Sequence, residues 1–156
     1  MTEISVQSDD FDLGREVASL AALSQETGAV ASFVGYVRGD KTGTRVDGGV
    51  TAMTLEHYPG MTEAALAAIV ESARQRWKLD ALRVIHRVGR LQPGEQIVLV
   101  AVASRHRGDA FAACEFIMDF LKTQAPFWKK EETPEGARWV DARESDDMSA
   151  RRWGSD

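Results

Sequence analysis

One stretch of nine residues constrains the fold more than any other. Residues 96–104 (QIVLVAVAS) are apolar at almost every position. A strand with one face in water alternates apolar and polar side chains, whereas an unbroken apolar strand is covered on both faces. The stretch therefore predicts a central strand. Residues 82–88 predict its partner, and the intervening Pro93-Gly94 pair predicts a hairpin turn.

The remaining patterns predict helices and further strands along the chain. Helices are expected at 9–28, 61–77 and 109–124, and strands at 29–38, 50–58 and 138–142. Gly28 is the expected end of the first helix, and Gly35 predicts a bulge or a close backbone approach within its strand.

The helix expected at 109–124 carries apolar side chains on two faces. Phe116 and Phe120 lie opposite the main apolar stripe. Such a helix is either buried centrally or shared with another subunit. The stripe expected to face the core consists of Ala110, Phe111, Cys114, Ile117, Met118 and Leu121.

Length and composition predict one domain. The chain has 156 residues, of which 44% are hydrophobic, enough for a sizeable core. We expect residues 1–143 to form the domain and the charged residues 144–156 a flexible tail, although Trp153 indicates a docking contact. A cytoplasmic protein is expected, because no apolar run approaches the roughly 18 residues of a membrane span and the N-terminus lacks the order of a signal peptide.

Positive charge is concentrated where the central strand passes into the helix. Arg105-His106-Arg107 occupies this junction in a chain of net charge −5. Helix N-termini attract anions, and arginine pairs in plane with carboxylates and phosphates. The pattern predicts an anion site at 105–107, with a solvated basic sheet edge as the alternative. The acidic balance argues against general nucleic-acid binding.

Three of the five lysines lie between residues 122 and 130. Lys122 projects at the rim of an apolar helix face, where loss of hydration would favour a nucleophilic or acid–base role. The pattern alone favours a simpler alternative, which is a salt bridge to Asp119 or a snorkelling side chain. Lys129-Lys130, beside Phe127-Trp128, forms either a surface patch or the far wall of the same pocket.

Several classes of protein find little support. The single cysteine, Cys114, excludes an internal disulfide, lies on the apolar stripe and is expected to be a buried structural residue. No metal site is expected, and protease, zinc-enzyme and Rossmann motifs are missing from the sequence. His57 is expected to be structural, and the glycine-rich residues 39–49 are expected to form a mobile loop without a P-loop pattern.

Six segments of the chain carry a recognisable combination of motifs. They are GAVASFVGYVR (28–38), LEHYPGM (55–61), IHRVGRLQPGE (85–95), ASRHRGDAF (103–111), FLKTQAPFWKKE (120–131) and WVDAR (139–143). Together they resemble one enzyme family, the large, catalytic subunit of molybdopterin synthase. The likeness covers about residues 10–143 and implies an α+β protein, with an α/β hammerhead-type fold and an additional antiparallel sheet region.

The resemblance implies a sulfur transfer in molybdenum cofactor biosynthesis. A small ubiquitin-like partner subunit would supply sulfur as a thiocarboxylate on its C-terminal Gly-Gly, and cyclic pyranopterin monophosphate would be converted to molybdopterin. No cofactor is implied. Two large subunits would form a central homodimer, with a small subunit at each end of the heterotetramer.

The resemblance also assigns roles to residues of this chain. Lys122 and Lys129 would be catalytic, and Arg143 is a candidate for binding the partner's tail. In this family the site is shared across the dimer, so His106 and Arg107 could serve the neighbouring subunit's Lys122. The substrate-binding residues would be Tyr36, Val37, Arg38, His106, Arg107, Lys130 and Glu131.

Two other functions use the same basic residues. One is a non-catalytic anion- or nucleotide-binding module. The other is a Schiff-base lysine enzyme that acts through Lys122 without a partner protein.

Overall fold

The computed structural model describes residues 3–39, 49–140 and 144–154. The expected loop at 39–49 therefore lies almost entirely outside the described residues. The elements follow the order β1 (Ile4–Gln7), α1 (Leu13–Ala21), β2 (Ala29–Tyr36), β3 (Ala52–His57), α2 (Met61–Arg76), β4 (Ala81–Arg87), β5 (Gly89–Leu91), β6 (Gln96–Ser104), α3 (Arg107–Gln124), β7 (Phe127–Thr133), β8 (Gly136–Val140) and α4 (Glu144–Arg151).

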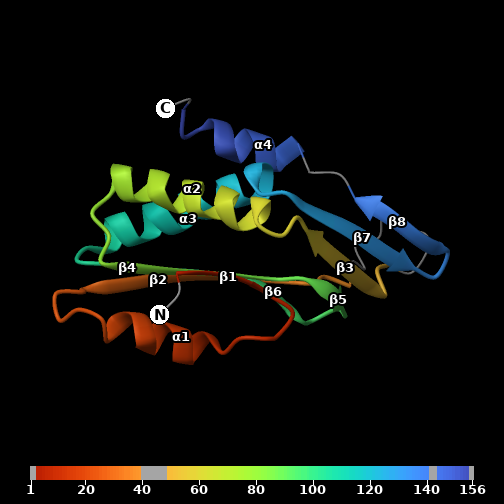
Figure 1. The fold of residues 1–156 in the computed structure, drawn as a ribbon, viewed down its shortest axis with the longest axis horizontal. Coiled ribbons are helices and arrows are strands. Elements are labelled where there is room, and N and C mark those ends of the chain that lie inside the picture. Colours follow the sequence, from red (N-terminus) through yellow and green to blue (C-terminus); the bar gives the residue numbers. More distant parts are fainter. Residues whose placement is uncertain (1–2, 40–48, 141–143, 155–156) are drawn as a thin grey trace.

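The first sheet has the strand order β1-β4-β6-β2. β1 runs parallel to β4, and the other pairs are antiparallel. Helices α2 and α3 cover one face and α1 covers the other (Figure 1). β6 lies inside this sheet and is buried from Ile97 to Ser104. The prediction of a central strand covered on both faces is therefore confirmed.

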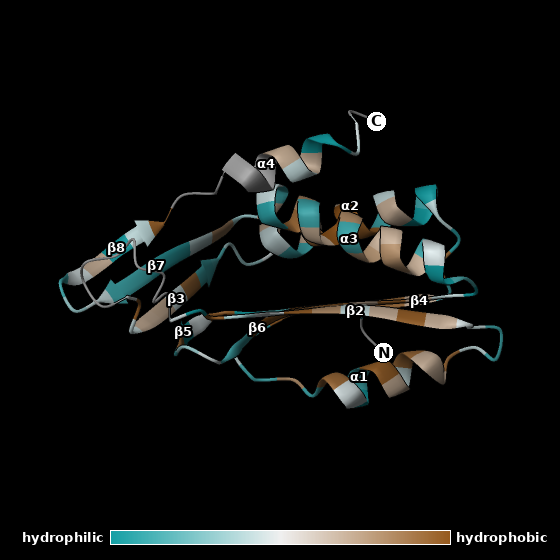
Figure 2. Ribbon diagram, turned by 180° about the vertical axis from the view of Figure 1, so that it is seen from behind, coloured by the Kyte–Doolittle hydropathy of each residue, from teal (hydrophilic) through white to brown (hydrophobic). Residues whose placement is uncertain are grey.

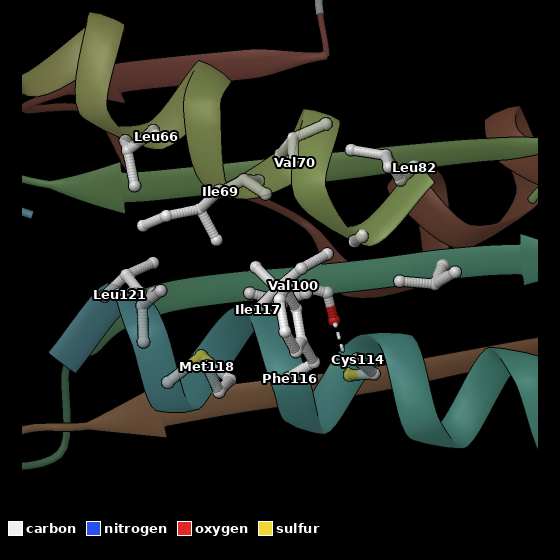
Figure 3. Close-up of a cluster of buried hydrophobic side chains, with 14 of the residues drawn as sticks. Leu66, Ile69, Val70, Leu82, Val100, Cys114, Phe116, Ile117, Met118 and Leu121 are labelled. Carbon is white, nitrogen blue, oxygen red and sulfur yellow. Dashed lines mark hydrogen bonds between the residues drawn. The ribbon is translucent and has the colours of Figure 1, made fainter. Parts of the chain in front are cut away.

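The main core lies between this sheet and the helix pair α2 and α3. Val98, Val100 and Val102 of β6 contribute to it, whereas Leu99 and Ala101 face α1. Side chains from both helices meet over Val100 (Figure 3). Burying each large aliphatic side chain contributes about 1.5–3 kcal/mol, so this layer holds the helices on the sheet.

Helix α3 is buried centrally, as in the first of the two predicted arrangements. Most of its predicted stripe is buried, but Phe111 is wrongly included because it is 65% exposed. The opposite face packs inside the same chain. Phe116 lies 5.3 Å from Trp77 and 5.5 Å from Trp153, measured between ring centroids.

The second sheet is antiparallel, with the order β5-β3-β7-β8. The predicted hairpin differs from the structure in its connection, which contains the additional strand β5. Strands β4 and β6 do pair, but residues 89–91 leave the first sheet and pair with β3, Met53 opposite Leu91. Gly89, with φ of 95°, permits this departure. The molecule is thus α+β, a hammerhead-type fold with an added antiparallel sheet, as expected (Figure 1).

Helix α1 is much shorter than the predicted helix at 9–28. It begins after Asp12, whose Oδ1 accepts a hydrogen bond from Arg15 N at 2.8 Å, and it ends at Ala21. Asp12 is therefore the N-cap of α1. Gly28 does not end the helix. It begins the approach to β2, and its N–H donates to Ser104 O at 3.0 Å.

Gly28 packs against the backbone at the start of the basic triplet. A Cβ at this position would lie 2.2 Å from the Arg105 carbonyl oxygen. We expect Gly28→Ala to lower the free energy of unfolding by about 1–3 kcal/mol through overpacking, as measured by urea denaturation. Gly108→Ala is the control, because nothing lies within 4 Å of its Cβ position. A Gly28→Ala protein as stable as wild type would contradict the close approach.

The C-terminal residues form α4, which lies over α2 and α3 (Figure 1). The predicted docking of Trp153 is confirmed. Its ring lies 5.7 Å from that of Trp77, and its Nε1–H donates to Asp119 Oδ2 at 2.7 Å. The proposed division at residue 143 stays a prediction. Across the described residues, no helix has the length and apolar character needed to traverse a bilayer.

Candidate active site

Strand β7 turns its two lysines to opposite sides. Side chains alternate along a strand, so Phe127, Lys129 and Glu131 share the inner face. Glu131 is 6% exposed, which shows that this face is turned towards the protein body. Lys130 is on the outer face, 5.6 Å from the Trp139 ring centroid. The structure therefore does not bring Lys129 and Lys130 into one pocket wall.

Lys122 occupies the last turn of α3 and is partly buried. The pattern alone favoured a salt bridge to Asp119 or a snorkelling side chain, and the first of these two alternatives is wrong. The Asp119 carboxylate instead accepts from Trp153 Nε1 and from Arg152 Nη2, the latter at 2.8 Å. Arg152 and Trp153 thus bind the Asp119 carboxylate. Within the described chain, Lys122 forms no ion pair with Asp119.

His86 is a buried histidine whose electrostatic surroundings include both candidate catalytic lysines. It is the penultimate residue of β4, is 3% exposed, and stacks on Phe127 with 3.7 Å between ring centroids. Burial is the main cause that lowers the pKa of His86 from 6.5 to about 3, and the positive charges of Lys122 and Lys129 contribute to the same shift. Both lysines therefore lie close to one buried, neutral imidazole.

The sequence patterns did not identify His86 as a site residue. The alternation of Leu82, Val84 and His86 was the available signal, because it places the histidine on the core face of β4. His57 lies opposite Phe127 in the neighbouring strand, with Nε2 3.4 Å from Glu63 Oε1.

The buried imidazole predicts a specific loss of stability in acid. Between about pH 6.5 and 3 the unfolded chain binds a proton at His86 that the folded chain does not. The free energy of unfolding should therefore fall as the pH falls, at up to about 1.4 kcal/mol per pH unit from this group. Urea unfolding of wild type and His86→Phe across this range should show a shallower dependence in the variant. Parallel curves would contradict the assignment.

Of the three residues in the predicted anion site at 105–107, Arg105 already forms an ion pair. Arg105 Nη2 pairs with Glu26 Oε1 at 3.0 Å. His106 is the N-cap of α3, Arg107 is its first residue, and both are exposed. Neither forms an ion pair in the part of the chain that is described. The candidate anion-binding residues at 105–107 are therefore His106 and Arg107. Both lie at the N-terminus of α3, and helix N-termini attract anions.

The arginines of β4 and β5 form structural contacts. Arg83 pairs with Glu16 at 3.2 Å, and Arg90 pairs with Glu132 at 3.0 Å. Arg87 is buried and donates to the Ser8 and Gln96 carbonyl oxygens. These contacts hold β4 and β5 against neighbouring segments. Arg83, Arg87 and Arg90 therefore do not form an anion-binding surface.

The two clusters lie at opposite ends of one helix. Fifteen residues separate Arg107 from Lys122 on α3. At 1.5 Å per residue this corresponds to about 22 Å along the axis. Within one chain, His106 and Arg107 therefore cannot contact a small molecule bound at Lys122.

The end of β2 places three further candidates in different environments. Val37 is 2% exposed, and its backbone bonds to Glu95 O and Gly94 N. Tyr36 and Arg38, by contrast, are exposed. The bulge predicted from Gly35 is confirmed by a register shift between Gly35 and Tyr36.

The last two candidates are Glu131 on β7 and Arg143, which follows β8 in the sequence. Glu131 Oε2 lies 3.5 Å from Arg138 Nη2 on β8. Arg143 lies outside the described residues. No group of three or more potential metal ligands occurs among the residues with described positions. The site is thus cationic, with two lysines beside a neutral histidine.

The fold and the lysine pair define a hammerhead-type α+β protein with a cationic site for an anionic substrate. A profile of the MoaE protein family matches residues 6–124. The molybdopterin synthase catalytic subunit of Ralstonia nicotianae is 63% identical over 99% of this chain and 85% of that protein. Its Escherichia coli counterpart is 56% identical over 97% and 98%.

A solved structure agrees with these relatives. The molybdopterin biosynthesis MoaE protein from Burkholderia ambifaria is 56% identical, covers all of both chains and superposes with a TM-score of 0.83. The chain belongs to the MoaE family, the catalytic subunits of molybdopterin synthase. The family resemblance found in the sequence motifs is therefore confirmed, and with it the assignment as an enzyme.

Proposed function

We propose that this chain transfers sulfur from the C-terminal thiocarboxylate of a small ubiquitin-like partner to cyclic pyranopterin monophosphate, producing molybdopterin in the cytoplasm. The observation that carries the proposal is the pair of lysines beside buried His86, in a member of a family of catalytic subunits. In each transfer a bond forms between sulfur and a pterin carbon, a carbon–oxygen bond at that carbon breaks, and the departing oxygen takes up a proton. The acyl–sulfur bond of the partner then breaks, and water supplies the oxygen of the carboxylate that leaves.

We assign the two lysines different roles in the reaction. Lys122 acts on the thiocarboxylate and the pterin carbons during sulfur attack, as an acid–base group or by positioning them. Lys129 stabilises developing negative charge. The remaining proposed contacts to substrate are Tyr36, Val37, Arg38, His106, Arg107, Lys130 and Glu131, and Arg143 is proposed for the partner's carboxyl tail.

We further propose that two copies of the chain share each site. The separation of about 22 Å along α3 supports this arrangement, because it keeps Arg107 away from Lys122 of the same chain. Phe111, one turn after Arg107, is 65% exposed, as expected of a side chain that a second copy covers. Such a homodimer, with a small subunit at each end, is the proposed heterotetramer.

The transferred sulfur is not proposed to come from Cys114. This residue is 7% exposed, and its Sγ donates to Val100 O at 3.6 Å (Figure 3). Burial raises the pKa of the thiol to about 11, so it stays protonated at neutral pH and is a poor nucleophile. The sulfur therefore has to be delivered from outside the chain.

Cys114→Ala should retain the wild-type rate of molybdopterin formation. The substitution leaves a small cavity and should cost about 1 kcal/mol of stability. Rates are compared in the reconstituted reaction, with unfolding curves to confirm the fold. A correctly folded Cys114→Ala protein that makes no product would remove the case for sulfur supplied by the partner.

Reconstitution tests the proposed function itself. The purified chain, a thiocarboxylated small subunit and the pyranopterin precursor should together yield molybdopterin, and omission of the partner should abolish it. A chain that binds the precursor without product formation would instead be an anion-binding module. Trapping of Lys122 by borohydride with a carbonyl substrate, without any partner, would indicate a Schiff-base enzyme.

A further inference from the structure

The C-terminal residues Arg152 and Trp153 bind one carboxylate of α3. Trp153 Nε1–H donates to Asp119 Oδ2 at 2.7 Å, and Arg152 Nη2 donates to the same oxygen at 2.8 Å. Arg152 also pairs with Glu115, one turn earlier on the helix. The Asp119 side chain is only 15% exposed, so these donors take the place of water at the carboxylate. Asp119 is thus directed at the C-terminal segment.

Packing against two helices fixes the Trp153 ring. The ring lies nearly perpendicular to those of Trp77 and Phe116, with interplanar angles of 88° and 78°. Arg76 Nη1 donates to the Trp153 carbonyl oxygen at 3.1 Å. Helix α4, which precedes this residue, lies over α2 and α3 (Figure 1). The Nε1–H donor therefore has a fixed position relative to α3 before any substrate binds.

Helix spacing makes Asp119 a competitor for the amine of Lys122. The two residues are three positions apart on α3. Side chains with this spacing are neighbours on a helix surface, and an acid and a base there form an ion pair. In the part of the chain that the structure describes, the carboxylate is instead bound by Arg152 and Trp153. Two charge-assisted hydrogen bonds to a preorganised partner outweigh one ion pair to a flexible lysine.

We propose that Arg152 and Trp153 are positioning residues of the sulfur-transfer site, because they keep the Asp119 carboxylate from pairing with Lys122. The inference rests on the proposed function for its effect on the reaction, but the competition for Asp119 does not depend on it. An ion pair would turn the amine towards Asp119 and occupy N–H groups that the anionic substrate needs. The C-terminal segment thus leaves Lys122 available to the substrate.

A rescue experiment separates this positioning role from packing. Arg152→Met/Trp153→Phe removes both donors but retains a ring at the Trp153 position. We expect its single-turnover rate to be about three- to tenfold lower than that of the wild type, because the released carboxylate pairs with Lys122. Adding Asp119→Asn should restore the rate to within about twofold of the wild type, since the effects of coupled residues are not additive.

Arg151→Met is the matched control for the loss of positive charge. Arg151 ends α4, is exposed, and forms no ion pair within the described chain. This variant should retain the wild-type rate. A folded Arg152→Met/Trp153→Phe protein with the wild-type rate would overturn the proposal. So would a loss that Asp119→Asn does not reverse, because such a loss would come from packing alone.

Carbon-13 spectroscopy tests the pairing on the free chain, without the reaction. The chain has five lysines, so ¹³Cε-lysine labelling gives few signals, and Lys122→Met identifies the one from Lys122. We expect this signal to move in Arg152→Met/Trp153→Phe and to return when Asp119→Asn is added. A signal that stays in place in the double variant, or that Asp119→Asn does not return, would overturn the proposal.

The outcomes distinguish this inference from the proposed function. If the wild-type chain made no molybdopterin, the proposed function would fail, while the ¹³C spectra would still decide whether Asp119 is kept from Lys122. If the double variant did not fold, Trp153→Phe alone, which removes one donor and keeps a ring, would be measured in the same two ways. A smaller loss and a smaller shift, both reversed by Asp119→Asn, are then expected, and their absence would overturn the proposal.

Discussion

Lys122→Ala lowers the rate of molybdopterin formation by about 10²–10⁴-fold, the usual range for loss of a general acid–base or charge-stabilising group. The expectation follows from the position of Lys122, partly buried in the last turn of α3 and close to neutral His86. Asp119 does not neutralise it, because that carboxylate binds Arg152 and Trp153. Single-turnover assays with a thiocarboxylated small subunit give the rate.

A matched control separates the role of Lys122 from a general effect of lysine charge. Lys78 is exposed and follows α2 in the connection to β4, away from the site. Lys78→Ala should retain the wild-type rate at the same net charge as Lys122→Ala. If Lys122→Ala kept the wild-type rate while folding normally, Lys122 would have no catalytic role.

Two inactive variants should restore each other when they share a dimer. Arg107→Ala removes a cation at the start of α3, and Lys122→Ala removes the amine near its end. If each site combines Arg107 of one chain with Lys122 of the other, a mixed dimer contains one intact site. Random exchange makes half of the dimers mixed, so activity should recover to about a quarter of wild type.

The control for this experiment mixes two variants from the same cluster. Lys122→Ala and Lys129→Ala alter one pocket, so their mixture should restore an intact site only if the two lysines come from different chains. Mass spectrometry verifies that mixed dimers form. Mixed dimers of Arg107→Ala and Lys122→Ala without any activity would contradict the shared site.

The parts of the fold predicted best were long and strongly periodic. Helix α2 was predicted at 61–77 and spans Met61–Arg76, and the central strand was predicted at its observed bounds. Burial on one or both faces imposes these patterns directly on the sequence. Short elements carry too few residues for a period, which is why β1, with four residues, was missed.

Strand β7 was missed for a different reason. Its sequence, FWKKEET, is largely hydrophilic, in contrast to the apolar strands of the first sheet (Figure 2). Pairing with β3 and β8 holds it in place rather than an apolar face of its own. A strand that presents lysines to a site departs from the alternation by which strands are predicted.

The candidate site was predictable in its residue types but not in its geometry. The motifs identified Lys122 and Lys129, yet the pairing of Lys122 was wrong because the competing groups, Arg152 and Trp153, lie about 30 residues further on. For His86, the alternation with Leu82 and Val84 indicated only that the side chain faces the core, whereas its stack on Phe127 joins strands distant in sequence. Local patterns contain no information about such tertiary contacts.

The central claim is that this chain transfers sulfur from a partner to a pterin. A single turnover with ³⁵S-labelled thiocarboxylate on the small subunit, unlabelled catalytic chain and the pyranopterin precursor tests it most directly. The account predicts that the label appears in molybdopterin, that the partner's tail ends as a carboxylate, and that Cys114→Ala gives the same result. Molybdopterin with unlabelled sulfur, or label retained on the catalytic chain, would contradict it.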